Sequence, residues 1–153
     1  MNTLPLLGEE EQEDTTELYR LQARSLQSVD RAVADIIQTL EETGRLSNAA
    51  IIYTTDNGFS MGEHRWIPKR CVYESCSRVP LLIRAPGIHP RTEDSLVSII
   101  DLTATILDFA GLSAPTGMDS VSLAGLLNNP GTLYRKSILL ELFDQPYEKK
   151  MNF

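Results

Sequence analysis

An unbroken apolar run, "AAIIYT" from Ala49 to Thr54, is the feature that most constrains the fold of this chain. It shows none of the alternation between polar and apolar residues that marks a strand with one face in water. Such runs are typical of strands that are covered on both faces, as in a parallel sheet between helices. The run therefore predicts an α/β fold.

The segments around this run fit the same fold class. Before it, apolar residues recur at i, i+3 and i+4 from Glu17 to Thr43, which predicts a long amphipathic helix. After it, the sequence predicts four further elements: a strand at Val79–Ile83, a helix at Asp101–Ala110, a short helix at Val121–Leu127 and a strand at Ser137–Phe143. Helices that alternate with buried strands indicate a mostly parallel sheet with flanking helices.

The length of 153 residues suits one domain, and 42% of the residues are hydrophobic. Much of the acidity is local, in "GEEEQEDTTE" near the start of the chain. We expect residues 1–16 to be a flexible, solvated leader, residues 17–145 to form the folded domain, and residues 146–153 to be a tail.

Charge and motif spacing exclude several classes of protein. Fourteen Lys and Arg against twenty-one Asp and Glu give a net charge of -7, which argues against a general nucleic-acid binder. No stretch is long and apolar enough to span a membrane, and no secretory signal opens the chain. Cys71 and Cys76 match no zinc or C-x-x-C spacing, so we predict two unpaired thiols.

Chemistry first appears where the apolar run ends. In open α/β sheets, ligands bind beyond the carboxyl ends of the strands, and Asp56 and Asn57 follow that end directly. A carboxylate beside an amide carbonyl supplies hard oxygen ligands for Ca²⁺ or Mg²⁺. Asp-Asn-Gly is also ordinary turn chemistry, so the motif alone leaves a bare turn open.

Two side chains of the following loop extend this possible site. Lys69 lies thirteen positions after Asp56, and an ammonium beside a metal can neutralise a tetrahedral anion. His64 could donate a hydrogen bond or a proton to such a group. From composition alone, an exposed surface residue is the favoured interpretation of each. Trp66 is expected to pack the loop.

The segment "YTTDNGFSMGEHRWIPKRCVYESCSRVPLLIRAPGI" resembles the sulfatase family, within the alkaline-phosphatase-like superfamily. Members tend to read as a strand, (S/T)-DNG, a GEH-type loop, K-x-x-x-Y-E and then R-V-P-L. "VSIIDLTATILDFAGL" and "MDSVSLAGLL" are similar to later family segments. The resemblance covers roughly residues 19–127, and the pattern is most similar to arylsulfatases and N-acetylglucosamine-6-sulfatases.

The resemblance implies roles for individual residues. Asp56 and Asn57 fall where sulfatases ligate a divalent cation, usually Ca²⁺. Lys69 falls on the lysine that contacts sulfate, and His64 lies in the loop at the rim of the active site. Glu74 and Arg78 match the family as well and are interpreted as structural partners. The implied substrate is a sulfate ester, of an aryl compound or a carbohydrate.

The sequence departs from the family in what it lacks. Sulfatases make a formylglycine nucleophile from the Cys or Ser of C/S-x-P/A-S-R, and nothing here matches. "CSRVP", from Cys76, has Arg78 where Pro or Ala is required. The paired aspartates that complete the metal site are absent too. We therefore expect the C-terminal part of a sulfatase catalytic domain, a sulfuric ester hydrolase by family that is inactive alone.

Other readings of the sequence stay open. One is a truncated remnant without catalysis, or an interaction protein. Another is a phosphodiesterase or phosphonate hydrolase relative, although those more often carry Asp-His where this chain has Asp56 and Asn57. Because a few strands of a large sheet would leave open edges, we also expect either marginal stability or association with another chain that covers those edges.

Overall fold

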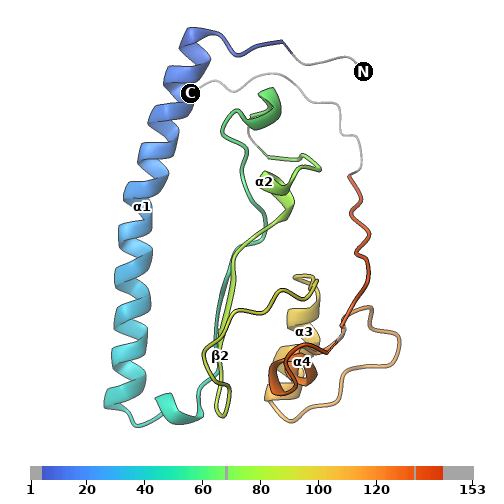
Figure 1. Ribbon diagram of the computed structural model, residues 1–153. Helices are drawn as coiled ribbons and strands as arrows, with labels where there is room; N and C mark the ends of the chain where they lie inside the picture. The colour runs from blue at the N-terminus through green and yellow to red at the C-terminus, as the bar shows by residue number, and fades with distance from the viewer. Residues whose placement is uncertain (1–4, 68, 133, 143–153) are drawn as a thin grey trace.

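The computed structural model describes residues 5–67, 69–132 and 134–142, which form a long helix, a two-stranded sheet and a pair of short helices (Figure 1). The long helix α1 (Glu9–Glu42) leads through the 3-10 turn η1 (Leu46–Asn48) into strand β1 (Ile51–Thr54). Within the described chain, no helix combines the length and the apolar character needed to cross a membrane.

Helix α1 begins at Glu9 rather than at the predicted Glu17. The backbone amide of Gly8 donates to Glu11 Oε2 at 2.9 Å, which closes the N-terminal turn. Three glutamates occupy the first turn, where negative charge interacts favourably with the helix dipole. Residues 9–16, predicted to belong to a flexible leader, are therefore helical.

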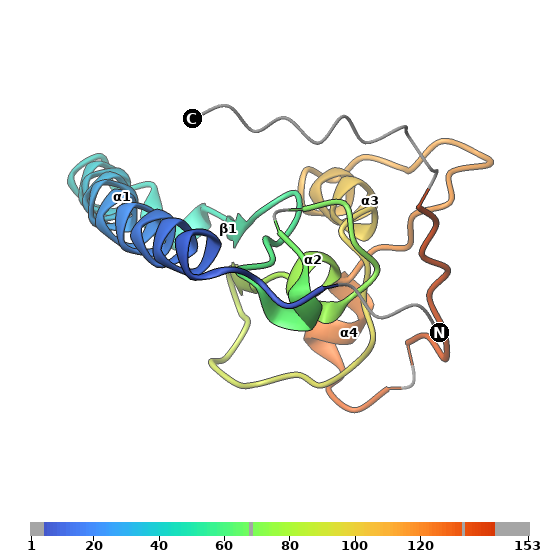
Figure 2. The ribbon, with the colours of Figure 1, turned by 90° about the horizontal axis from the view of Figure 1, so that it is seen from above.

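Many apolar side chains of α1 are exposed, although Val33, Ile37 and Leu40 are half-buried. Thr15 is the only buried residue of this helix in the part of the chain that the structure describes. We define the α1 stripe as its exposed or half-exposed apolar side chains: Leu18, Leu21, Leu26, Val29 and Ile36. Figures 1 and 2 show α1 standing away from the helix pair at the other side of the molecule. The amphipathic pattern thus marks a face that the described part of the chain covers only in part.

Strands β1 and β2 (Leu81–Arg84) pair in an antiparallel register that sets Ile52 opposite Ile83 and Tyr53 opposite Leu82. The sequence predicted mostly parallel strands, and this pair is different. A parallel crossover usually passes through an α-helix that packs on the sheet, whereas residues 55–80 hold only η2 (Glu63–Arg65) and the four-residue α2 (Glu74–Ser77). The chain therefore turns back and pairs antiparallel.

Helices α3 (Asp101–Phe109) and α4 (Ala124–Asn128) form the best-packed part of the molecule. Ala104, Leu123 and Leu126 are buried between them. The Thr105 hydroxyl joins the helices, because it donates to the Asp101 carbonyl at 2.7 Å and accepts from the Leu123 amide at 2.8 Å.

The carboxylate of Asp101, which is fully buried, fixes the segments around α3. It accepts hydrogen bonds from the amides of Ser98 at 2.9 Å and Val121 at 3.0 Å. Arg135 donates to both of its oxygens, each at 2.9 Å. Such a bidentate pair is among the stronger polar contacts available to a protein.

Two predicted elements differ from the structure near the C-terminal end. The short helix starts at Ala124 instead of Val121, because the amides of Val121 and Leu123 bond to side chains of α3. Residues 137–142 form no strand, since no neighbouring strand pairs with them. Phe143 and the predicted tail at 146–153 lie outside the described residues.

Replacing Asp101 by Asn is expected to lower the free energy of local unfolding of α3 by about 3 kcal/mol. The reason is that Arg135 loses the carboxylate to which two of its nitrogens donate hydrogen bonds. Hydrogen exchange of the α3 amides measures this energy. Asp119→Asn, at an exposed position in the loop between α3 and α4, is the control and should change it by less than about 0.5 kcal/mol. Equal effects of the two substitutions would contradict the anchoring role of Asp101.

Candidate functional site

The predicted site residues all lie in residues 55–80, the connection between β1 and β2, which we call the site loop. Asp56 and Asn57 follow the end of β1, as predicted. Asp56 Oδ1 accepts from the Asn57 amide at 2.9 Å and from the Thr55 hydroxyl at 3.3 Å. The Asn57 side-chain amide donates to the Gly58 carbonyl at 2.8 Å. These bonds hold both side chains in a tight turn at the strand end.

Gly58 packs the start of the site loop against its far end. Its amide donates to the Cys76 carbonyl at 2.8 Å. A Cβ at this position would lie 2.0 Å from the carbonyl oxygen of Ser75, so only glycine permits the approach. The turn that presents Asp56 and Asn57 is therefore seated directly on α2.

Glu63 organises the middle of the site loop, a role that the sequence analysis missed. Its carboxylate accepts from the Met61 amide at 2.6 Å and from the hydroxyl of the fully buried Ser60 at 3.1 Å. Hydrogen bonds from its own amide and those two groups, with the charge of His64, outweigh desolvation and lower the pKa of the Glu63 carboxyl.

His64 is exposed, and its ring stacks on that of Tyr73 with centroids 4.0 Å apart and an interplanar angle of 19°. The backbone around it is unusual: His64, Arg65 and Arg70 have φ values of 55°, 62° and 66°. Non-glycine residues rarely adopt this left-handed region, and where they do the surrounding structure must enforce it. Tyr73 provides part of that enforcement, which the sequence did not reveal.

Lys69 is exposed, so its ammonium is open to an anion from solvent. Its backbone carbonyl accepts from the indole nitrogen of Trp66 at 3.2 Å, and Trp66 is half-buried, as expected of a residue that packs the loop. Arg78 and Glu74 form an exposed ion pair at 3.3 Å, which agrees with their interpretation as structural partners.

Cys71 and Cys76 form a disulfide, and the prediction of two unpaired thiols is wrong. The α2 turn explains the pairing, because it brings the two Cα atoms to 5.7 Å, a separation that a disulfide readily spans. Spacing alone could not reveal this turn, since the pair fits no recognised cysteine motif.

The chemistry of the predicted metal ligands fits a hard divalent cation in part. Asp56 and Asn57 offer carboxylate and amide oxygens, whereas Ca²⁺ takes six to eight oxygen ligands. Among the residues described, no group of three or more His, Cys, Asp or Glu side chains comes together as a metal site. These two side chains can therefore supply only some of the ligands of such a cation.

The sequence profile of the family described as Sulfatase matches residues 7–112, more than half of the chain. This chain belongs to the sulfatase family. Human N-acetylglucosamine-6-sulfatase is 43% identical to it over 127 residues, which make up 80% of this chain and 23% of the human protein. The chain thus spans about a quarter of the length of the curated sulfatases that it matches.

Solved structures show the same fold. A protein in complex with its substrate D-glucosamine-2-N,6-O-disulfate aligns with a TM-score of 0.68 at 37% identity, over 80% of this sulfatase chain and 26% of its own. The phosphonate monoester hydrolase from Silicibacter pomeroyi gives 0.64 at 35% identity, over 70% and 22%. These likenesses confirm the predicted α/β fold class and its partial extent.

Acidification should loosen the site loop. Because the pKa of the Glu63 carboxyl is lowered in the folded chain, its ionised form stabilises the fold. This stabilisation is fully present at pH values above the pKa that the same carboxyl has in the unfolded chain. That stabilisation is lost as the pH falls through the folded pKa of Glu63, which lies below the usual pKa of a glutamate. We expect the emission of Trp66 to shift in this window.

In Glu63→Gln, emission should resemble the acid form at neutral pH and lose this pH step, because an amide cannot ionise. Glu141→Gln, at an exposed residue outside the site loop, is the matched control. A step that persists unchanged in Glu63→Gln would contradict the role of this carboxylate.

Proposed function

We propose that this chain carries part of the active site of a sulfuric ester hydrolase, and that Asp56, Asn57, His64 and Lys69 are its contribution. The proposal rests on the composition of the site loop, in a chain that belongs to the sulfatase family. In one connection it holds the oxygen donors at the end of β1, the stacked His64 and the open Lys69. His64 and Lys69 were predicted as the catalytic residues, and they keep those roles here.

Each residue has a separate task in this proposal. Asp56 and Asn57 would hold part of the shell of a divalent cation, preferably Ca²⁺, which when bound offsets negative charge on the sulfate oxygens. The Lys69 ammonium binds the sulfate group from the open side of the loop. His64 donates a hydrogen bond or a proton toward the oxygen of the leaving alcohol.

The nucleophile is not among these residues. The sequence holds no C/S-x-P/A-S-R motif from which a sulfatase would make formylglycine. We therefore propose that the chain alone does not turn over a sulfate ester, and that its residues act only with a nucleophile from elsewhere.

The relatives favour a carbohydrate sulfate as the substrate class. N-acetylglucosamine-6-sulfatases share about two fifths of the aligned residues, and one aligned structure was solved with D-glucosamine-2-N,6-O-disulfate as its substrate. We propose that the site loop serves the 6-O-sulfate of a glucosamine, rather than an aryl sulfate.

Phosphonate monoester hydrolysis is the second candidate. The observation in its favour is the TM-score of 0.64 with the hydrolase from Silicibacter pomeroyi. Asn57 argues against phosphonate hydrolysis, because such enzymes more often carry an Asp-His pair where this chain has Asp56 and Asn57. A protein that only binds a partner is the third candidate. This candidate does not explain why the site loop matches sulfatases.

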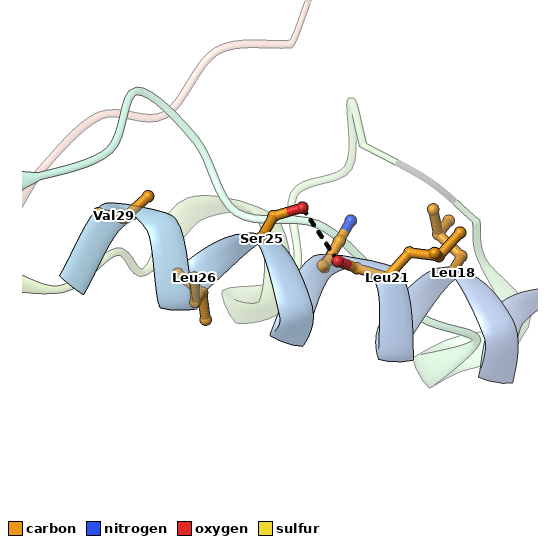
Figure 3. A pocket seen from close by; sticks show the side chains of 6 residues that line it. Leu18, Leu21, Ser25, Leu26 and Val29 are labelled. Carbon is orange, nitrogen blue, oxygen red and sulfur yellow. Dashed lines mark hydrogen bonds between the residues drawn. The ribbon is translucent and has the colours of Figure 1, made fainter. Parts of the chain in front are cut away.

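We also propose that a second polypeptide carrying more of a sulfatase fold covers the open faces of this chain. The chain exposes 12197 Å², whereas a compact protein of 17.1 kDa exposes about 7,800 Å². Figure 3 shows Leu18, Leu21 and Val29 of the α1 stripe, which line a shallow apolar hollow. Tyr53 of β1 and Leu82 of β2 are exposed too, so that one face of the sheet is also uncovered there.

The purified chain with Ca²⁺ is expected to release no 4-nitrophenol from 4-nitrophenyl sulfate above the buffer rate, because it lacks a nucleophile. 4-Nitrophenyl phosphonate esters test the second candidate in the same assay. Turnover of the sulfate ester that a chelator abolishes would overturn the proposal of inactivity, and turnover of the phosphonate alone would favour the second candidate.

Calcium should bind weakly, with a dissociation constant of about 1 mM, because two side chains complete little of its shell. In isothermal titration calorimetry, Asp56→Ala should remove this binding, whereas Asp119→Ala, at an exposed loop position, should leave it unchanged. Binding that survives in Asp56→Ala would contradict the proposed ligand.

The open α1 stripe is expected to make the isolated chain self-associate, which sedimentation velocity measures as a function of concentration. Leu26→Glu with Ile36→Glu should reduce this association, because both side chains are more than half exposed, at 55% and 56%. Gln27→Glu with Ala34→Glu, both exposed on the same helix, adds the same two charges and is the control. A monomer with a sharp two-state thermal transition would contradict the need for a covering chain.

A further inference from the structure

The Cys71–Cys76 disulfide lies where the parts of the site loop converge. Cys76 is buried and belongs to α2, whereas Cys71 is half-buried and lies before it. No task in the proposed hydrolysis uses either sulfur. Their surroundings nevertheless connect them to each of the four proposed site residues.

The first connection runs through Gly58. Its amide donates to the carbonyl of Cys76 itself, and its Cα packs against the carbonyl of Ser75. Because Gly58 directly follows Asp56 and Asn57, the position of α2 sets the position of both predicted cation ligands.

The second connection runs through Tyr73, which lies between the two cysteines in the sequence. Its ring stacks on His64, and its carbonyl accepts from the Cys76 amide at 2.9 Å and from the Ser77 amide at 3.0 Å. The disulfide therefore closes the turn that holds the ring under His64.

The third connection is the chain before Cys71. Lys69 is two residues away, and its carbonyl accepts the indole hydrogen of Trp66. Arg70, between Lys69 and Cys71, has a positive φ of 66°, a conformation that persists only where neighbouring contacts enforce it. The bond at Cys71 supplies such a constraint.

We propose that the Cys71–Cys76 disulfide is a redox-sensitive positioning element, and that reducing it releases the site loop from its arrangement around Asp56, Asn57, His64 and Lys69. The part that concerns cation binding rests on the proposed function, whereas the release of the loop does not. Helix α2 has only four residues, too few to persist as a helix by its own hydrogen bonds. Without the disulfide, single hydrogen bonds such as those to the Tyr73 carbonyl, and the exposed Glu74–Arg78 pair, hold this turn.

The reductant is a dithiol. Its thiolate attacks Cys71 Sγ, the sulfur of the more exposed residue, and Cys76 leaves as a thiolate that takes up a proton. The second thiol of the reductant then displaces Cys71, which is protonated in turn. Two electrons and two protons pass to the protein, and the dithiol becomes a cyclic disulfide.

Trp66 gives the test a direct readout, because it is the single tryptophan and belongs to the site loop. We expect dithiothreitol to shift its emission and to speed hydrogen exchange at residues 57–66 by about tenfold, the effect of opening one or two hydrogen bonds. Exchange in α3 should stay unchanged, which separates a local role from general destabilisation. Mass spectrometry confirms the two thiols.

The double variant Cys71→Ser with Cys76→Ser is the matched control, since dithiothreitol should not change a chain that has no disulfide. Gly58→Ala should produce the same faster exchange with the disulfide intact, because its Cβ meets the Ser75 carbonyl. Unchanged emission and exchange after full reduction would overturn the proposal, as would two free thiols in the air-oxidised chain.

Calcium titration separates this proposal from the proposed function. An affinity that falls about tenfold on reduction, the energy of about one lost hydrogen bond, supports both. If neither form binds Ca²⁺ but the loop still opens on reduction, the proposed cation site fails and the positioning role stands.

Discussion

The backbone of Gly58 touches the turn at Ser75 and Cys76, and the presentation of Asp56 and Asn57 depends on this contact. The amide hydrogen bond to Cys76 and the absence of a Cβ let the two ends of a long connection meet. The disulfide to Cys71 and the stack of Tyr73 on His64 extend the same contact along the loop. A short antiparallel sheet thus carries an organised loop without a large core beneath it.

Among the described residues, the largest group of buried polar contacts lies outside the site loop, around α3. Asp101 gathers Ser98, Val121 and Arg135 around α3, and its carboxylate is fully buried. The site loop has no comparable anchor in the described residues and relies on local bonds such as that of Glu63. Stability and proposed chemistry therefore lie in different parts of the fold, so that a change in one is separable from a change in the other.

Sequence patterns predicted what local chemistry determines. The helix at Asp101, the strand before Asp56 and the membership of the sulfatase family all agree with the structure and the comparisons. Strand direction and the disulfide were missed, because both depend on how residues 55–80 fold back, and no periodic pattern encodes that path. The start of α1 was missed because acidic residues were interpreted as a solvated leader, although they also favour a helix N-terminus.

The central claim, that one loop holds both cation and sulfate contacts, is tested most directly by amide NMR of the oxidised chain. Titration with Ca²⁺ should move the signals of residues 55–58. Addition of N-acetylglucosamine 6-sulfate should then move those around His64 and Lys69, while signals of α3 stay in place. Changes that spread over the whole chain, or no change at the site loop with either ligand, would contradict the account.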